Sequence, residues 1–228
     1  MIISISGKIG SGKDTVGSII QYLTETPNYN TKNSYKKWLI LKQFSRHNPN
    51  NWQIKKFADK LKDIACMMLS CTREQLEDQE FKKTVLGPEW NNMTVREFLQ
   101  KLGTEAMRNG LHENVWVNSL MCDYKPDSYT RVSVTYIASK LPNWIITDTR
   151  FSNEFEAVKA KGGITIRVVR SFNHKMGSKE TGTLDLSPRH PSETALDNAK
   201  FDYEIVNDGT IEDLIEKVRV ILIELSII

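Results

Sequence analysis

The residues whose types and spacing best suit chemistry lie in the segment 7–15, GKIGSGKDT. Gly7, Gly12 and Lys13 fit the pattern G-x-x-x-x-G-K, in which glycines let successive backbone N–H groups turn toward phosphate oxygens. The lysine adds a positive charge, and a helix beginning beside it adds the positive end of its dipole. A tight turn without a ligand is the alternative, but such a turn does not need Lys13. The segment therefore predicts a nucleotide-binding loop, to which we assign Gly7, Gly10, Ser11, Gly12, Lys13, Asp14 and Thr15.

The residue after Lys13 departs from the usual pattern. Asp14 stands where serine or threonine commonly holds Mg²⁺. Thr15 follows and can take that place, or Asp14 can contact a water molecule on the metal. We therefore predict ATP and Mg²⁺ as cofactors, with Asp14 and Thr15 as the metal-binding residues. The four histidines lie far apart in the chain, so a zinc site built by the protein is not expected.

A second candidate segment is WIITDTRFSNE at 144–154, which begins as a buried strand. Asp148 follows that strand, and ligands in open α/β sheets bind at the carboxyl ends of strands. An acid there can orient Mg²⁺ through water or accept a hydrogen bond from a second substrate. Arg150 and Glu154 are close enough in sequence to join it. The alternative is that Asp148 only caps the following turn.

Transfer of a phosphoryl group requires several cations, because negative charge spreads over the moving group and its neighbours. Arg96 begins a helix that we expect to stop at Gly103, next to the hydroxyl of Thr104. Each candidate can equally be an ordinary surface charge. The candidates are Lys62, Arg96, Arg108, Arg150, Arg167, Arg170 and Arg189.

Two further positions could contact the base of a nucleotide. Trp116 can stack on a base or wall it off, although a core position is the plainer interpretation. Asn207 and Gly209 follow the last predicted strand and can pass under an adenine. The plainer alternative for this pair is a turn into a capped helix.

The elements that must position these residues alternate between strand and helix at both ends of the chain. Strands are predicted at 1–6, 52–57, 144–147, 164–169 and 203–206. Helices are predicted from the glycine-rich turn to about Leu23, at 95–102, 114–124 and 153–160, and after a capping box formed by Thr210 and Asp213. This order indicates an α/β fold: a three-layer, mostly parallel sheet with helices on both faces.

Composition excludes several classes of protein. The chain of 228 residues is 39% hydrophobic and 26% charged, which is ordinary for a globular protein. No apolar run approaches the roughly 20 residues that span a bilayer, and no cleavage signal precedes the first strand. The three cysteines form no CxxC pair. We therefore expect a cytoplasmic protein with no membrane partner and no disulfide framework.

The net charge of +3 is too small to imply a polyanionic partner, but basic residues are concentrated at 28–62. Aromatic residues are interleaved with them there, as in surfaces that bind nucleic acids. A basic face beside a small phosphate-bearing substrate is the plainer interpretation. DNA is therefore a partner only under an alternative interpretation of function.

Taken together, these segments resemble the bacteriophage-type deoxynucleoside monophosphate kinases of the P-loop nucleotide kinase superfamily. The matching segments run in order over nearly the whole chain: SGKDT (11–15), FADKLKD (57–63), VREFLQKLGTE (95–105), VWV (115–117), ITDTRFSNE (146–154), VVR (168–170), HPSETAL (190–196) and VNDGTIEDL (206–214). The resemblance implies that Lys13 and Thr15 serve ATP, that Asp14 is usual at its position, and that relatives form homodimers. It implies an acceptor side lined by Lys62, Arg96, Thr104, Trp116, Asp148 and Arg150, and less securely by Arg108.

The resemblance implies phosphorylation of deoxynucleoside 5′-monophosphates by ATP. We expect Lys13, Asp148, Arg150 and Arg170 to act in catalysis. Two alternatives stay open: a P-loop kinase with another acceptor, such as hydroxymethylated bases in DNA or dephospho-CoA, and a P-loop protein that senses nucleotide or binds nucleic acid without catalysis. We expect one kinase domain, with a core over about 1–25, 143–170 and 200–228, a mostly helical acceptor-binding insertion over about 26–142, and a lid over about 171–199.

Overall fold

The computed structural model describes residues 1–25, 34–44, 52–126, 141–170 and 194–228. These residues fall into two compact units. We call residues 1–55 with 126–228 the sheet unit, and residues 56–125 the helical unit. Within the described ranges, no helix is both long and apolar enough to cross a membrane.

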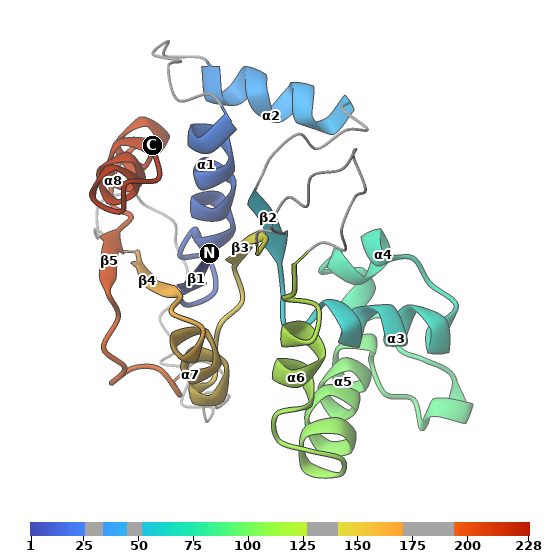
Figure 1. Ribbon diagram of the computed structural model, residues 1–228. Coiled ribbons are helices and arrows are strands. Elements are labelled where there is room, and N and C mark those ends of the chain that lie inside the picture. The colour runs from blue at the N-terminus through green and yellow to red at the C-terminus, as the bar shows by residue number, and fades with distance from the viewer. Residues whose placement is uncertain (26–33, 45–51, 127–140, 171–193) are drawn as a thin grey trace, which may run out of the picture. The chain divides into compact units, whose positions relative to one another are not determined.

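The sheet unit is built on five parallel strands in the order β2-β3-β1-β4-β5 (Figure 1). Parallel strands buried on both faces are near-continuous apolar runs, and the strand sequences IISIS and ITIRVV have this character. The arrangement confirms the predicted α/β fold with a parallel sheet. The strands are β1 (Ile2–Ser6), β2 (Trp52–Lys55), β3 (Asn143–Ile146), β4 (Ile164–Val169) and β5 (Tyr203–Val206).

Helices cover both faces of this sheet. Successive strand residues point to opposite faces, so the apolar side chains on each face need a helix to bury them. α1 (Lys13–Glu25) and α8 (Ile211–Glu224) pack against each other and share one core with Ile3, Ile5 and other strand residues (Figure 1). α7 (Ser152–Ala160) contacts β1 and β4, and the space beside Gly163 is filled by Val158 and Ile2. Ile2 alternates with Ile3 along β1, so α7 lies on the opposite face.

An aromatic cluster joins α2 (Ser34–Phe44) to α1. Tyr22, Tyr35 and Trp38 have ring centroids 5.3–6.0 Å apart. The Trp38 indole N–H donates to Glu25 Oε2 at 2.5 Å. α2 therefore packs into the core of the sheet unit.

The compact helical unit begins at residue 56, and β2 and α2 lie in the sheet unit. β2 adds to the edge of the sheet beside β3. Most of the predicted lid, 171–199, lies outside the described residues, as do Arg189 and most of the segment 190–196. The functional division into core, insertion and lid stays a prediction.

The helical unit packs around Ala65, Leu76, Val95 and Phe98. Capping boxes begin two of its helices, at Thr72 with Gln75 and at Thr94 with Glu97. Its elements are α3 (Asp59–Leu69), α4 (Arg73–Glu77), η1 (Phe81–Lys83), η2 (Pro88–Trp90), α5 (Val95–Gln100), η3 (Lys101–Asn109) and α6 (Val115–Met121).

The prediction that Gly103 stops a helix is wrong. α5 continues directly into η3, a π-helix that runs to Asn109. Gly103 packs closely against another helix: a Cβ there would lie 2.9 Å from Leu61 Cδ2. The Gly103 carbonyl also accepts a hydrogen bond from Trp116 Nε1 at 2.9 Å. Sequence pattern alone does not separate a glycine that ends a helix from one that lets two elements approach.

Two neighbouring residues of α8 test the packing of the sheet unit. Leu222 is fully buried in the core, whereas Ile223 is 55% exposed. We expect Leu222→Ala to lower the free energy of unfolding by about 2–5 kcal/mol, because it leaves a cavity. Ile223→Ala, the matched control, should change it by no more than about 0.5 kcal/mol. Chemical denaturation of both variants measures the difference, and equal effects would contradict the assigned faces of α8.

Candidate functional site

The loop between β1 and α1 has the backbone geometry of a phosphate cradle. Gly10 and Gly12 have φ angles of +76° and +98°, which residues with a side chain rarely adopt. The Ser11 N–H donates to the Lys8 carbonyl at 3.1 Å, and the Val16 N–H donates to the Gly12 carbonyl at 2.9 Å. The loop therefore turns tightly and leads directly into the first turn of α1, as the sequence predicts.

The loop is held in place by the residue that follows β5. Asn207 Nδ2 donates to the Ser11 carbonyl at 2.9 Å. A Cβ at Gly12 would lie 2.5 Å from the same Nδ2 atom, so Gly12 is required for this approach. A Cβ at Gly7 would likewise lie 2.6 Å from the Val168 carbonyl oxygen. Asn207 therefore has a positioning role that the sequence does not indicate, and its contact with a base stays a prediction.

Gly209 lies in the turn before α8. A Cβ there would lie 2.5 Å from Asp213 Oδ2, the atom that accepts the Thr210 backbone N–H. Gly209 therefore accommodates the capping box of α8, which is the plainer alternative drawn from the sequence. A role for Gly209 in nucleotide binding stays a prediction.

One buried polar atom in the loop fits a bound nucleotide. Ser11 is 3% exposed, and its hydroxyl oxygen has no hydrogen-bond partner within the described part of the chain. Buried hydroxyl groups are normally paired, and a phosphate oxygen bound in the loop would supply this hydroxyl with a partner. A triphosphate in the cradle offers acceptor oxygens, and the loop residues Gly7–Thr15 are the ones that would hold it.

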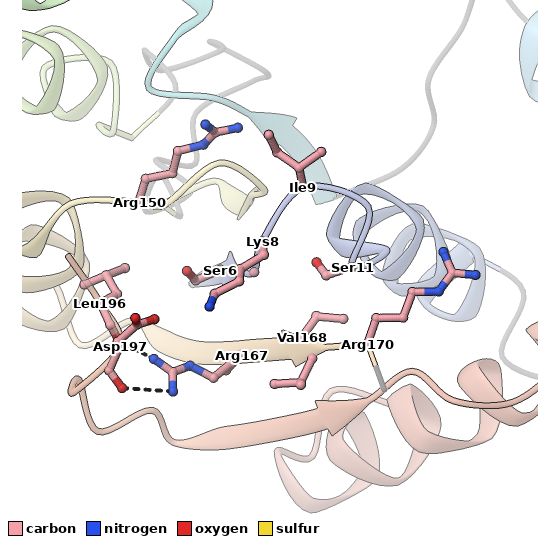
Figure 2. A pocket seen from close by; sticks show the side chains of 12 residues that line it. Ser6, Lys8, Ile9, Ser11, Arg150, Arg167, Val168, Arg170, Leu196 and Asp197 are labelled. Carbon is pink, nitrogen blue, oxygen red and sulfur yellow. Dashed lines mark hydrogen bonds between the residues drawn. The ribbon is translucent and has the colours of Figure 1, made fainter. Parts of the chain in front are cut away.

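A pocket of about 430 Å³ lies beside the loop at the carboxyl ends of β1 and β4 (Figure 2). Four of its lining residues are cationic and one, Asp197, is acidic. Such a lining favours an anionic ligand. The lining consists of Ser6, Gly7, Lys8, Ile9, Ser11, Arg150, Arg167, Val168, Val169, Arg170, Leu196 and Asp197.

The arginines of this pocket have different partners. Arg167 donates to the carbonyls of Leu196 and Asp197 (Figure 2). Its guanidinium carbon lies 4.6 Å from the centre of the Phe201 ring. Arg167 therefore holds the segment after residue 193 in place. Arg170 donates to the Gly10 carbonyl at 3.2 Å and so reaches the cradle directly.

The end of β3 is tied to α1. The Thr147 hydroxyl donates to Asp14 Oδ1 at 2.9 Å, and the Thr149 hydroxyl lies 2.6 Å from that of Ser4. Asp148, half-buried, lies between these two threonines. The structure thus brings Asp14 to the strand end that carries Asp148. No residue pattern indicated Thr147, because its partner is distant in the sequence.

Glu154 acts on the backbone of the loop that carries Arg150. It is 2% exposed, and its Oε2 accepts the N–H groups of Arg150 at 2.8 Å and Phe151 at 3.1 Å. Its carboxylate is thereby engaged in fixing the start of α7. Glu154 positions Arg150, and the direct contact with a substrate that we predicted for it stays untested.

The predicted metal residues lie together at the start of α1. Asp14 is exposed and Thr15 is half-buried. Among the described residues, no group of three or more acidic, histidine or cysteine side chains could hold a metal ion. Mg²⁺ commonly binds through one or two carboxylates together with phosphate oxygens and water, so Asp14 with Asp148 fits that donor set.

The remaining predicted residues belong to the helical unit. Lys62 Nζ lies 2.5 Å from Glu77 Oε1, and Arg96 Nη2 donates to Gln79 Oε1 at 3.0 Å. Thr104 and Arg108 lie in η3, and both are half-buried. Trp116 is 4% exposed, and its indole N–H donates to the Gly103 carbonyl. Both observations agree with the core interpretation drawn from the sequence. Its contact with a base stays a prediction.

Comparisons with known proteins identify a family. The family model described as "Deoxynucleotide monophosphate kinase" matches residues 50–218. A putative deoxynucleotide monophosphate kinase of Acanthamoeba polyphaga mimivirus is 28% identical over 174 residues, covering 72% of this chain and 79% of its own length. The deoxynucleotide monophosphate kinase of Escherichia phage RB69 is 31% identical over 129 residues, covering 57% of this chain. The match spans only 45% of the RB69 protein's own length.

A solved structure is also similar over most of the chain. Shikimate kinase from Aquifex aeolicus vf5 is 13% identical, with a TM-score of 0.44. The likeness covers 99% of this chain and 98% of that one. A likeness at this level carries no argument about function.

Two glycines with positive φ provide a matched test of the cradle. We expect Gly12→Ala to weaken ATP binding about tenfold or more, because it strains the backbone and collides with Asn207. Gly162, φ +67°, lies in the turn before β4, where a Cβ would meet no atom of the described residues within 4 Å. Gly162→Ala should lower stability by about 1–2 kcal/mol and leave ATP affinity unchanged. Calorimetric titration with ATP measures both, and unaltered affinity in Gly12→Ala would contradict the cradle.

Proposed function

The chain belongs to the deoxynucleotide monophosphate kinase family, and from this premise we propose that it transfers the γ-phosphoryl group of ATP to the 5′-phosphate of a deoxynucleoside monophosphate. The observation that carries the proposal is the glycine cradle at Gly7–Thr15. Inside it lies the Ser11 hydroxyl, which has no partner among the described residues, and beside it lies a cationic pocket. Binding of a polyphosphate satisfies both features at once. The family membership supplies the acceptor class.

The proposed reaction is a direct, in-line transfer. An oxygen of the acceptor's 5′-phosphate forms a bond to the γ-phosphorus while the bond from that phosphorus to the β,γ-bridging oxygen breaks. The products are the deoxynucleoside diphosphate and ADP, and no covalent enzyme intermediate forms. The attacking oxygen belongs to a phosphate that is already ionised near neutral pH, so the reaction needs charge stabilisation more than a general base.

The residues of the sheet unit have separate parts in this proposal. Lys13 places its charge on the β- and γ-phosphates, and Arg170 supports the loop through the Gly10 carbonyl. Arg150, whose backbone N–H is held by the Glu154 carboxylate, supplies a further positive charge. Asp14 and Asp148 are the residues that would hold Mg²⁺ through water, and the ion supplies neutralisation of the phosphate charge when bound.

The helical unit is proposed to bind the acceptor. Lys62, Arg96, Thr104 and Arg108 provide cations and a hydroxyl for the phosphate and sugar. The buried Trp116 holds η3 in place through Gly103. A homodimer and a location in the cytoplasm, that of the host for a phage-encoded protein, remain predictions.

The described aromatic residues of 28–62 weigh against a DNA acceptor. Tyr35 and Trp38 are at most 9% exposed and stack inside the sheet unit. Trp52 and Phe57 are also buried, at 5% and 3% exposed. Aromatic rings that bind single strands must present a face to the bases. The other aromatic side chains of this stretch, Tyr29 and Phe44, lie outside the described part. A small nucleotide acceptor is therefore the better-supported choice.

The reaction is tested with purified protein, ATP, Mg²⁺ and each deoxynucleoside monophosphate in turn. At least one of them should raise ADP formation and yield the corresponding diphosphate. Lys13→Ala should lower kcat/KM about 100-fold or more, because it removes a positive charge that stabilises the transferred phosphoryl group. Lys161→Ala, a change of an exposed lysine at the end of α7, is the control. Full activity in Lys13→Ala, or no stimulation by any acceptor, would contradict the proposal.

The proposed metal requirement has its own test. Removal of divalent ions with EDTA should reduce turnover to background, and added Mg²⁺ should restore it. Asp14→Asn should raise the Mg²⁺ concentration needed for half-maximal rate, since it removes a carboxylate from the metal side of the loop. The control Glu156→Gln removes an exposed carboxylate of α7 that lies outside the pocket lining. An unchanged Mg²⁺ dependence in Asp14→Asn would remove Asp14 from the proposed metal site.

A further inference from the structure

Three cations of the helical unit converge on the end of α4. Lys62 Nζ lies 2.5 Å from Glu77 Oε1, and Lys82 Nζ donates to the Glu77 backbone carbonyl at 3.4 Å. Arg96 Nη2 donates to Gln79 Oε1 at 3.0 Å. These cations come from three different elements, α3, η1 and α5. They therefore meet because of the fold of the unit and not because they are neighbours in sequence.

The three cations repel one another. The pKa of Lys82 lies below its usual value, first because the amine is partly buried and next because of the positive charge of Lys62. Arg96 contributes in the same direction, while Glu77 and Asp78 oppose it. Cations held close enough to oppose each other's charge form a site that an added anion relieves.

Glu77 is the anion that now occupies this position. Partial burial raises its pKa, but the hydrogen bond from Lys62 and the charges of Lys62, Lys56 and Lys82 outweigh burial, so the pKa lies below its usual value. Arg73 Nη2 is 3.8 Å from the same carboxylate oxygen. One carboxylate thus faces several cations.

Arg73 contributes little to the excess of positive charge. It lies 2.8 Å from both Asp59 and Asp63, which balance its charge. Within the described part of the chain, Lys62, Lys82 and Arg96 have no such pair of carboxylates at short distance. A phosphate group carries up to two negative charges and three acceptor oxygens, so it matches these cations better than one carboxylate does.

The pair between Lys62 and Glu77 is accessible on one side only. The Lys62 side chain is 15% exposed, whereas that of Glu77 is 50% exposed. Glu77 can therefore turn into solvent while Lys62 stays in the unit. A phosphate that forms an ion pair with Lys62 must therefore displace the Glu77 carboxylate from it.

We infer that Glu77 competes with the acceptor's 5′-phosphate for Lys62, and that Lys82 is a further phosphate-binding residue beside Lys62 and Arg96. This inference rests on the proposed function and assigns two determinants of acceptor affinity that the sequence patterns do not indicate. Glu77 sets the affinity by occupying the site in the substrate-free protein. Lys82 adds a charge that neither Lys62 nor Arg96 supplies.

The same segment offers matched controls. Lys83 and Glu80 form an exposed ion pair at 2.8 Å, three residues apart, with the same residue types as Lys82 and Glu77. Lys83 directly follows Lys82 in η1. Substitutions at Lys83 and Glu80 therefore change net charge identically without touching the cation cluster.

The test compares KM for the acceptor and KM for ATP among these variants. Glu77→Gln should lower the acceptor KM about two- to fivefold, because a competing carboxylate is removed. Lys82→Gln should raise the acceptor KM about tenfold or more, and Lys82→Arg should largely restore it. Glu80→Gln and Lys83→Gln should change it less than twofold, and KM for ATP should stay constant throughout. Thermal unfolding verifies that each variant is folded.

A purely structural role gives a different result. If the ion pair serves only the fold, Glu77→Gln lowers the melting temperature and leaves the acceptor KM unchanged or raised, which overturns the inference while the kinase activity stands. If the unaltered protein phosphorylates no acceptor, the proposed function fails separately. Calorimetric titration with inorganic phosphate then tests the phosphate site by itself. Tighter phosphate binding by Glu77→Gln than by Glu80→Gln supports the site, and equal binding by the two variants overturns it.

Discussion

The structure depends on one constraint, which is that a loop must point its backbone N–H groups at phosphate without a side chain in the way. Gly10 and Gly12 provide the positive φ angles that this requires. Asn207, from the far end of the sheet unit's sequence, holds the loop through the Ser11 carbonyl. The parallel sheet brings these segments together, because the carboxyl ends of β1, β4 and β5 lie along the same edge and both the loop and Asn207 follow from that edge.

At the end of β3, hydrogen bonds between segments fix the loop and the side chains beside the cradle. Glu154 accepts N–H groups from the loop that carries Arg150, and Thr147 joins that strand end to Asp14. In the helical unit, the Glu77 carboxylate pairs with Lys62 and lies 3.8 Å from Arg73 Nη2. Burying or clustering polar groups of this kind costs free energy unless each group has a partner. A charged ligand that supplies such a partner is therefore favoured at these places.

Much of the fold follows from sequence pattern, whereas the contacts that set the site do not. β4 and β5 lie at the residues that the apolar runs predict, and the Thr210 capping box begins α8 as expected. These features are local, so local patterns suffice. Gly103 departs from its predicted role because that role depends on Leu61 from another helix. The contact of Asn207 with the Ser11 carbonyl is likewise not visible in the sequence, since it depends on how distant segments pack.

The most direct measurement of the central claim follows the fate of a single phosphorus atom. ATP labelled at the γ-phosphate is incubated with the protein, Mg²⁺ and a mixture of deoxynucleoside monophosphates, and the products are separated. In-line transfer from the cradle predicts that the label appears in the β-phosphate of a deoxynucleoside diphosphate. Label found only in unreacted ATP or in free inorganic phosphate would contradict the account.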